Sequence, residues 1–266
     1  GLVESLIGER TKAILLVHQI GMPANIERFQ SICEKHDIKL IEDAACAIGS
    51  SFNGAKIGSH SDLVCFSFHP RKVITTGDGG MITTSNNEHL ERLKLLRQHG
   101  MSVNDRDRHL SKTVITEQYL EVGYNFRMTD VQAAMGIKQL EKLDWILDER
   151  KKIAAQYNEA FAPIEWMGLP IEAKGCSSNY QSYSITLKED CPISRDELMQ
   201  NLLDKGISTR RGIMLAHKEP AYKDHDGHAL PVSENLSLNS VLLPLYVPMS
   251  DDEVNYVIES VSALLI

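Results

Sequence analysis

The sequence predicts an α/β fold, in which a mostly parallel sheet lies between helices and a small α+β domain follows. Two observations support this prediction. Short apolar runs alternate with amphipathic stretches over residues 1–162, and a segment punctuated by Gly and Pro (163–175) separates them from a shorter set of strands and helices. Strands that alternate with crossover helices favour a parallel sheet. We therefore predict a large domain over residues 1–162, which includes a long helix, and a small domain over residues 163–266.

The first strand is expected at Ala13–Val17, where an unbroken apolar run is typical of a strand covered on both faces. A helix follows Pro23, and further strands are expected at 38–45, 62–68 and 79–84, with a helix after the last. The third and fourth strands are too close in sequence for a helical crossover, so one of them is expected to run antiparallel. A long amphipathic helix or helix pair covers residues 129–161.

The small domain is expected to hold strands at 183–187 and 241–246 and two helices with marked beginnings. Ser194 with Glu197 three residues later is typical of a capping box, and Ser250 with Glu253 repeats the pattern before the last helix.

Composition excludes several classes of protein. The chain has 36 acidic residues and 28 Lys and Arg, which gives a net charge of −8, and it has no long basic run. We therefore expect no nucleic-acid partner. The longest apolar runs fall far short of the ~20 residues that span a bilayer, so we expect no membrane partner. Five scattered cysteines without a C-x-x-C pair argue against a disulfide framework or a zinc site. We expect a cytoplasmic protein without a metal, and an exposed loop at residues 105–109.

Two residues stand where ligand chemistry is expected. Asp43 ends a predicted strand, at the edge where parallel strands open onto a crevice, and Lys72 follows the strand that ends near Ser67. A lysine amine can bond the aldehyde of pyridoxal phosphate, an aspartate can keep its pyridine nitrogen protonated, and a hydroxyl such as that of Ser67 can bind its phosphate. Alone, Asp43 is explained equally well as a helix N-cap or a loop carboxylate, and a lone lysine such as Lys72 is usually a solvated surface residue. Their combination favours a Schiff-base enzyme.

The segment EDAACAIGSSFNGAKIGSHSDLVCFSFHPRKVITTGDGGMITT (42–84) resembles the nucleotide-sugar aminotransferases of the DegT/StrS group, which are fold-type I enzymes dependent on pyridoxal 5′-phosphate. The resemblance continues through LRQHG (96–100) and VGYNFRMTDVQAAMGIKQLEKLD (122–144). It is weaker in KGISTRR (205–211) and LPLYVPMSDDEV (243–254), and it covers essentially the whole chain. It implies transfer of an amino group, with glutamate as donor, to a keto sugar linked to a nucleotide.

The motifs imply roles for individual residues. Lys72 matches the lysine that bonds the cofactor and shuttles protons, and Asp43 matches the partner of the pyridine nitrogen. Ala45 matches a residue against the ring face, and Ser67 matches a phosphate ligand. Asn125 matches a residue that reaches the cofactor phosphate of the neighbouring subunit, which implies a homodimer with shared active sites.

Three further residues are candidate substrate contacts by the same resemblance. His99 lines the substrate pocket in this interpretation, although a cap at a helix C-terminus explains it equally well. Arg127 is expected to meet a phosphate across the dimer or to have a structural role. Arg210, on a small-domain loop with Arg211 and His217, is expected to contact the phosphates of the nucleotide.

The chain departs from the family pattern in two places. Cys46 follows Ala45 where the family commonly has Gln, and a small buried apolar group is favoured there over a reactive thiol. Family members also have a further N-terminal stretch with a Gly-Thr turn for the phosphate and an aromatic ring that stacks on the cofactor. We expect this chain to correspond to the last two-thirds of such an enzyme, without that stretch and with sheet edges exposed.

Two alternatives to an active aminotransferase therefore stay open. The first is a truncated, inactive chain that serves as a non-catalytic dimerising module, with the helix at 129–161 and the small domain as its contact surface. The second is a pyridoxal-dependent sugar dehydratase. Lys72 argues against the dehydratase, because those relatives have His at this position.

Overall fold

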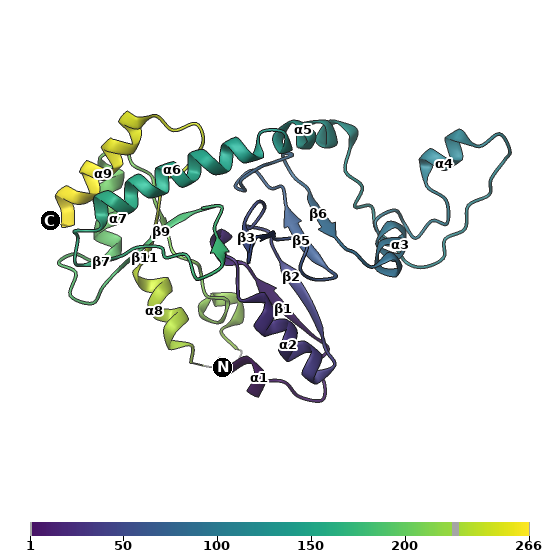
Figure 1. The fold of residues 1–266 in the computed structure, drawn as a ribbon, viewed down its shortest axis with the longest axis horizontal. Helices are drawn as coiled ribbons and strands as arrows, with labels where there is room; N and C mark the ends of the chain where they lie inside the picture. The colour runs from purple at the N-terminus through teal and green to yellow at the C-terminus, as the bar shows by residue number, and fades with distance from the viewer. Residues whose placement is uncertain (1, 225–228, 266) are drawn as a thin grey trace. The chain divides into compact units, whose positions relative to one another are not determined.

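A computed structural model describes residues 2–224 and 229–265 of the 266-residue chain (Figure 1). Its contacts divide the chain into two compact units. The first comprises Gly1–Gln19 and Pro23–Leu143, and the second comprises Ile20–Met22 and Asp144–Ile266. The domain boundary predicted at residue 162 stays a prediction.

The first unit is built on a four-stranded sheet in the order β1-β2-β5-β6. Its strands are β1 (Ala13–Val17), β2 (Lys39–Asp43), β5 (Val64–Ser67) and β6 (Gly80–Thr83). β1, β2 and β5 are parallel and β6 is antiparallel to β5, which confirms the predicted antiparallel strand. A short hairpin of β3 (Ser51–Phe52) and β4 (Ala55–Lys56) lies between β2 and β5 in the sequence.

Helices complete this unit: α1 (Leu2–Ser5), α2 (Ile26–His36), α3 (Asn87–Leu96), α4 (Asp105–Leu110) and α5 (Asp130–Leu140). α2 packs against β1 and β2 (Figure 1), and Asn25 caps its start by accepting a hydrogen bond from the Arg28 N–H. Buried Ile26 and Cys33 lie on the face that packs inward, seven residues and so two helical turns apart.

Two expectations for this unit are wrong. β1 is not covered on both faces, because Leu15 is 62% exposed and Val17 is 44% exposed, so a continuous apolar run does not by itself guarantee two covered faces. Residues 105–109 form α4 rather than a loop, since Asn104 caps the helix by accepting a hydrogen bond from the Asp107 N–H at 2.8 Å.

The second unit is a small α+β structure around an antiparallel sheet in the order β10-β11-β9-β7. Its strands are β7 (Met167–Gly168), β9 (Tyr183–Leu187), β10 (Arg210–Arg211) and β11 (Ser240–Leu243), with the short β8 (Cys176–Ser177) outside this sheet. Its helices are α6 (Leu143–Phe161), α7 (Arg195–Asp204), α8 (Pro231–Asn239) and α9 (Asp251–Leu265), and the short 3₁₀ helices are η1 (Gln19–Gly21), η2 (Ala216–Lys218) and η3 (Pro220–Tyr222).

Buried apolar side chains of α6, α7 and α9 and of β9 and β11 form one core in this unit. Residues 129–161 are a helix pair, and both predicted capping arrangements are present: Ser194 and Ser250 each accept a hydrogen bond from a Glu N–H three residues later. Arg150 is buried and donates to the carbonyls of Tyr180, Gln181 and Leu245, and burial lowers its pKa to about 10. In the described ranges, no helix is both long and apolar enough to cross a membrane.

Candidate active site

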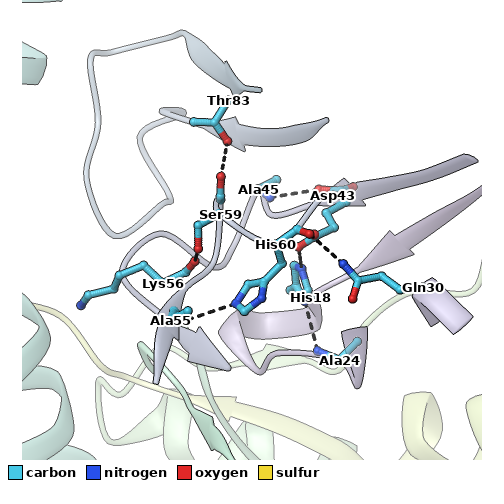
Figure 2. Close-up of polar contacts among 12 residues, drawn as sticks. His18, Ala24, Gln30, Asp43, Ala45, Ala55, Lys56, Ser59, His60 and Thr83 are labelled. Atoms are coloured by element: carbon cyan, nitrogen blue, oxygen red, sulfur yellow. Dashed lines mark hydrogen bonds and ion pairs between the residues drawn. The ribbon is translucent and has the colours of Figure 1, made fainter. Parts of the chain in front are cut away.

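The predicted acidic residue and the predicted hydroxyl lie at one edge of the first sheet. Asp43 is the last residue of β2 and Ser67 the last of the neighbouring β5, and the two strands are parallel with Asp43 opposite Cys65. Oδ1 of Asp43 accepts a hydrogen bond of 3.0 Å from the Ala45 N–H, which fixes the carboxylate in the turn after the strand (Figure 2). Burial raises the pKa of the Cys65 thiol, and the negative charge of Asp43 raises it further. The negative charge of Asp43 therefore acts on the side chain of Cys65 in the neighbouring strand β5.

Lys72 lies in the turn that follows β5, and hydrogen bonds to one residue close this turn. The Phe68 carbonyl accepts from the Thr76 N–H at 3.1 Å and from Thr75 Oγ1 at 2.9 Å, while the Phe68 N–H donates to the Gly79 carbonyl at 2.8 Å. The Lys72 N–H donates to the His69 carbonyl at 2.9 Å. Residues 68–79 thus form a closed loop that carries Lys72 at the edge of the sheet.

Helix α5 holds the far side of the same loop. Oε1 of Gln139 accepts from the Thr75 N–H at 3.3 Å, and Nε2 of Gln132 donates to the Asp78 carbonyl at 3.1 Å. Sequence reasoning did not identify Thr75, Gln132 or Gln139. The two glutamines are seven residues apart and therefore share one face of α5, but this spacing does not indicate which segment they bind.

Two glycines, Gly79 at the end of the loop and Gly80 at the start of β6, allow a close approach of β5 and β6. A Cβ on Gly80 would lie 2.6 Å from the Phe66 carbonyl oxygen, a distance that packed atoms do not adopt. Gly79 has φ +146°, in a region that only glycine adopts readily, and a Cβ there would lie 2.7 Å from Thr76 Oγ1. These glycines allow β6 to pair with β5 directly after the Lys72 loop.

The side chain of Lys72 contacts the residue that departs from the family pattern. Its Nζ lies 3.2 Å from Sγ of Cys46, and both side chains are half-buried. The amine of Lys72, the thiol of Cys46 and the Ala45 N–H that binds Asp43 thus come from two neighbouring turns after parallel strands.

Three other predicted residues form a second group in the same unit. Gln98 and Asn125 pair in an isolated β-bridge, the His99 N–H donates to the Tyr124 carbonyl at 2.8 Å, and Nε of Arg127 donates to Asn125 Oδ1 at 3.2 Å. The side chains of the three predicted residues, His99, Asn125 and Arg127, are exposed. The cap at the end of α3 is Arg97, so a role of His99 as the helix cap is wrong.

Arg210 belongs to the second unit, where it is exposed on β10 opposite Leu242 of β11. Near it in sequence, Arg211 lies 3.3 Å from Glu219 and His217 lies 3.1 Å from Glu234. A groove of about 930 Å³ in this unit is lined by Lys188, Arg195 and other residues around the start of α7, and none of the predicted site residues lines it.

The arrangement in the first unit fits the chemistry of pyridoxal phosphate. A primary amine, a carboxylate and a hydroxyl are held by turns at the ends of the parallel strands β2 and β5, and the Ser67 Oγ accepts a hydrogen bond of 3.3 Å from the His69 N–H. Closely approaching backbone at Gly79 and Gly80 borders the same loop.

Fold and comparisons together define the class: a mixed α/β structure with the fold of pyridoxal-phosphate-dependent aminotransferases. The model of the DegT/DnrJ/EryC1/StrS aminotransferase family matches residues 1–262, and the chain belongs to this family. The recognition made from the sequence motifs and the predicted fold class are both confirmed.

Three relatives illustrate the similarity. The uncharacterized protein MJ1066 of Methanocaldococcus jannaschii is 36% identical over 99% of this chain and 69% of its own length. PseC of Helicobacter pylori, an aminotransferase involved in the biosynthesis of pseudoaminic acid, superposes with a TM-score of 0.90 at 27% identity, covering 99% of this chain and 69% of that one. The protein Spr1654 of Streptococcus pneumoniae, named a putative sugar aminotransferase, gives in its PLP form a TM-score of 0.89 at 25% identity, covering 99% of this chain and 70% of that one.

Proposed function

We propose that the chain acts in an aminotransferase that depends on pyridoxal 5′-phosphate and transfers an amino group from glutamate to a keto sugar linked to a nucleotide. The observation that carries the proposal is the placement of Asp43 at the end of β2 and of Lys72 in the turn after the neighbouring parallel strand β5, within a member of this family. The PLP and PMP forms of Spr1654 support the choice of cofactor.

When bound, the cofactor supplies an aldehyde for amine exchange and a ring that accepts electrons from the substrate carbon. Lys72 is the residue that would bond the aldehyde, and its Nζ, when it is free of that bond, would carry protons to and from the substrate carbon. Asp43, fixed by the Ala45 N–H at 3.0 Å, would keep a proton on the ring nitrogen by opposing its positive charge. Ala45 would lie against the ring, and Ser67 would donate a hydrogen bond to the phosphate.

The remaining residues would act through a homodimer with shared active sites. In this proposal Asn125 reaches the cofactor phosphate of the second subunit, His99 and Arg127 line the substrate site beside it, and Arg210 contacts the nucleotide. The first unit presents exposed apolar side chains around Asn125 that a second copy would cover: Val114, Tyr119, Leu120, Val122, Tyr124 and Phe126. A cytoplasmic location is part of the proposal, because five scattered cysteines without a C-x-x-C pair are typical of reduced thiols.

An isotope-transfer assay tests the proposed reaction. The protein is incubated with pyridoxal phosphate, ¹⁵N-labelled glutamate and a nucleoside-diphosphate keto sugar, and the sugar products are separated by mass. We expect a ¹⁵N-labelled amino sugar, and none with the Lys72→Arg variant, which keeps the positive charge but cannot exchange the aldehyde.

Other products would contradict the proposal. A deoxysugar without label would indicate a dehydratase. A chain that remains dimeric and folded but gives no product would favour the non-catalytic module.

A further inference from the structure

The contact between Lys72 and Cys46 places an amine nitrogen against a sulfur atom in the predicted active site. The two atoms, Nζ and Sγ, are 3.2 Å apart. This separation lies within the ~3–3.5 Å of a near-attack arrangement, so a bond between them needs no rearrangement of the two turns. Both side chains are half-buried, so a small oxidant can reach the sulfur.

We propose that Cys46 is a redox modification site, whose sulfur, once oxidised by hydrogen peroxide, forms a reversible S–N bond with Nζ of Lys72. In the first step the thiolate attacks peroxide and the O–O bond breaks. Sulfur loses two electrons and becomes a sulfenic acid, and the second oxygen leaves as water after taking up the thiol proton. In the second step the lone pair of the Lys72 amine attacks sulfur, and the S–O bond breaks. The departing hydroxide takes a proton from nitrogen and leaves as a second water.

Three of the other four cysteines are less suited to the first step, and the fourth, Cys191, lines the groove at the start of α7 in the second unit. Burial raises the pKa of the thiols of Cys33, Cys65 and Cys176, and the nearby carboxylates of Asp43 and Glu172 raise it further at the last two. The thiolate is the form that reacts with peroxide, so these three thiols react slowly. The geometry therefore selects Cys46, where sulfur and a primary amine are already in contact.

The link would have a consequence that rests on the proposed function. An amine held in an S–N bond is a secondary amine with a single hydrogen, which cannot form an imine with the cofactor aldehyde, so oxidation would block loading at Lys72. Conversely, a cofactor already bonded to Lys72 would prevent the link. A thiol reductant would break the S–N bond and restore both groups, since sulfur at this oxidation level is reducible.

Peptide mapping tests the link without any cofactor. The reduced chain is treated with hydrogen peroxide, remaining thiols are alkylated, and the protein is digested with trypsin. Cys46 lies in the peptide 40–56, Cys65 in 57–71, and an uncleaved Lys72 begins the peptide 72–92, so the cysteines are distinguished by sequence. We expect a pair of 40–56 with 72–92 that is about 2 Da lighter than the sum, because two hydrogens are lost, and that disappears after reduction.

Matched variants sharpen the result. Cys46→Ser is expected to abolish the pair and Cys65→Ser to leave it unchanged. Lys72→Arg is expected to abolish the pair while a sulfenic acid at Cys46 becomes trappable with dimedone. The proposal is overturned if Cys46 stays alkylatable at peroxide doses that oxidise other thiols, or if it ends in a disulfide or a sulfinic acid with no link.

A separate readout keeps this proposal distinct from the proposed function. Borohydride reduction of the unoxidised chain with pyridoxal phosphate reports whether Lys72 bonds the cofactor. An S–N link in a chain that gains no pyridoxyl group on Lys72 would support the redox modification and overturn the proposed function. A pyridoxyl group on Lys72 in a chain that forms no S–N link would support the proposed function and overturn the redox modification.

Discussion

Two buried ionisable side chains lie side by side next to Asp43: Glu42, the preceding residue of β2, and His18, which directly follows β1. His18 and Glu42 are both 0% exposed, and His18 Nε2 lies 2.8 Å from Glu42 Oε2. His18 Nδ1 accepts the Ala24 N–H at 3.1 Å (Figure 2). Nε2 therefore carries the proton that Glu42 accepts. The other oxygen, Glu42 Oε1, is buried without a hydrogen-bond partner among the described residues.

Replacing Glu42 is therefore expected to be costly, by an amount that depends on the substitution. Glu42→Ala leaves the Nε2–H of a neutral His18 buried and unpaired, which costs about 1–3 kcal/mol of the free energy of unfolding, and it also opens a void that adds to this loss. Glu42→Gln keeps an acceptor for His18 but puts an NH₂ group where Oε1 has no partner. A buried donor left unpaired costs about 1–3 kcal/mol, so this variant is expected to lie between the wild type and Glu42→Ala.

Equilibrium urea unfolding followed by far-UV circular dichroism measures these changes in the free energy of unfolding. Glu91→Ala is a matched control, because it removes an exposed ion pair with Lys94 in α3 and is expected to have no measurable effect. A loss below about 1 kcal/mol for Glu42→Ala would refute the account of a buried, mutually dependent pair.

Three further predictions concern the Lys72 loop and α8. Hydrogen bonds from the Leu230 N–H and His217, together with Lys218, lower the pKa of Glu234 to about 2. The stability that this carboxylate contributes is therefore present above pH 4.5 and is lost as the pH falls toward 2. The difference in urea midpoint between the wild type and Glu234→Gln should shrink below pH 4.5, and a difference that stays constant would contradict this prediction. Gly80→Ala should destabilise by about 1–3 kcal/mol or more in urea unfolding because its Cβ meets a carbonyl oxygen, whereas Gly8→Ala, with nothing within 4 Å, should not. Thr75→Val removes the hydrogen bonds of Thr75 Oγ1 with the Phe68 carbonyl and the Gly77 N–H, so it should lower the free energy of unfolding by about 1 kcal/mol and speed amide hydrogen exchange in residues 72–79. Unchanged exchange in these residues would contradict the role of Thr75 in closing the loop.

The sequence predicted the elements whose local signals agree with their packing. β9 has the predicted bounds, because its alternation of buried and half-buried residues is a direct result of one face packing on the core. The antiparallel β6 followed from loop length alone, since the residues between β5 and β6 are too few for a helical crossover. Asp43 and Lys72 were found because strand ends are where parallel sheets gather functional groups.

Other features depend on tertiary contacts that a local pattern does not encode. The apolar run of β1 does not reveal that Leu15 is exposed, because exposure is set by what covers the strand. The hydrogen bonds of Gln132 and Gln139 to the Lys72 loop join segments more than 50 residues apart in the chain, beyond the reach of any spacing rule. The contact between Cys46 and Lys72 likewise requires the register of β2 and β5.

The most direct test of the account is to locate the bond between the chain and pyridoxal phosphate. The protein is mixed with the cofactor, reduced with borohydride and mapped by peptide mass. We expect a pyridoxyl group confined to Lys72. The amount of this adduct should fall in Asp43→Asn, because the substitution removes the charge that opposes the ring nitrogen. No adduct, or one spread over exposed lysines such as Lys35 and Lys138, would contradict the claim that the turns after β2 and β5 form the cofactor site.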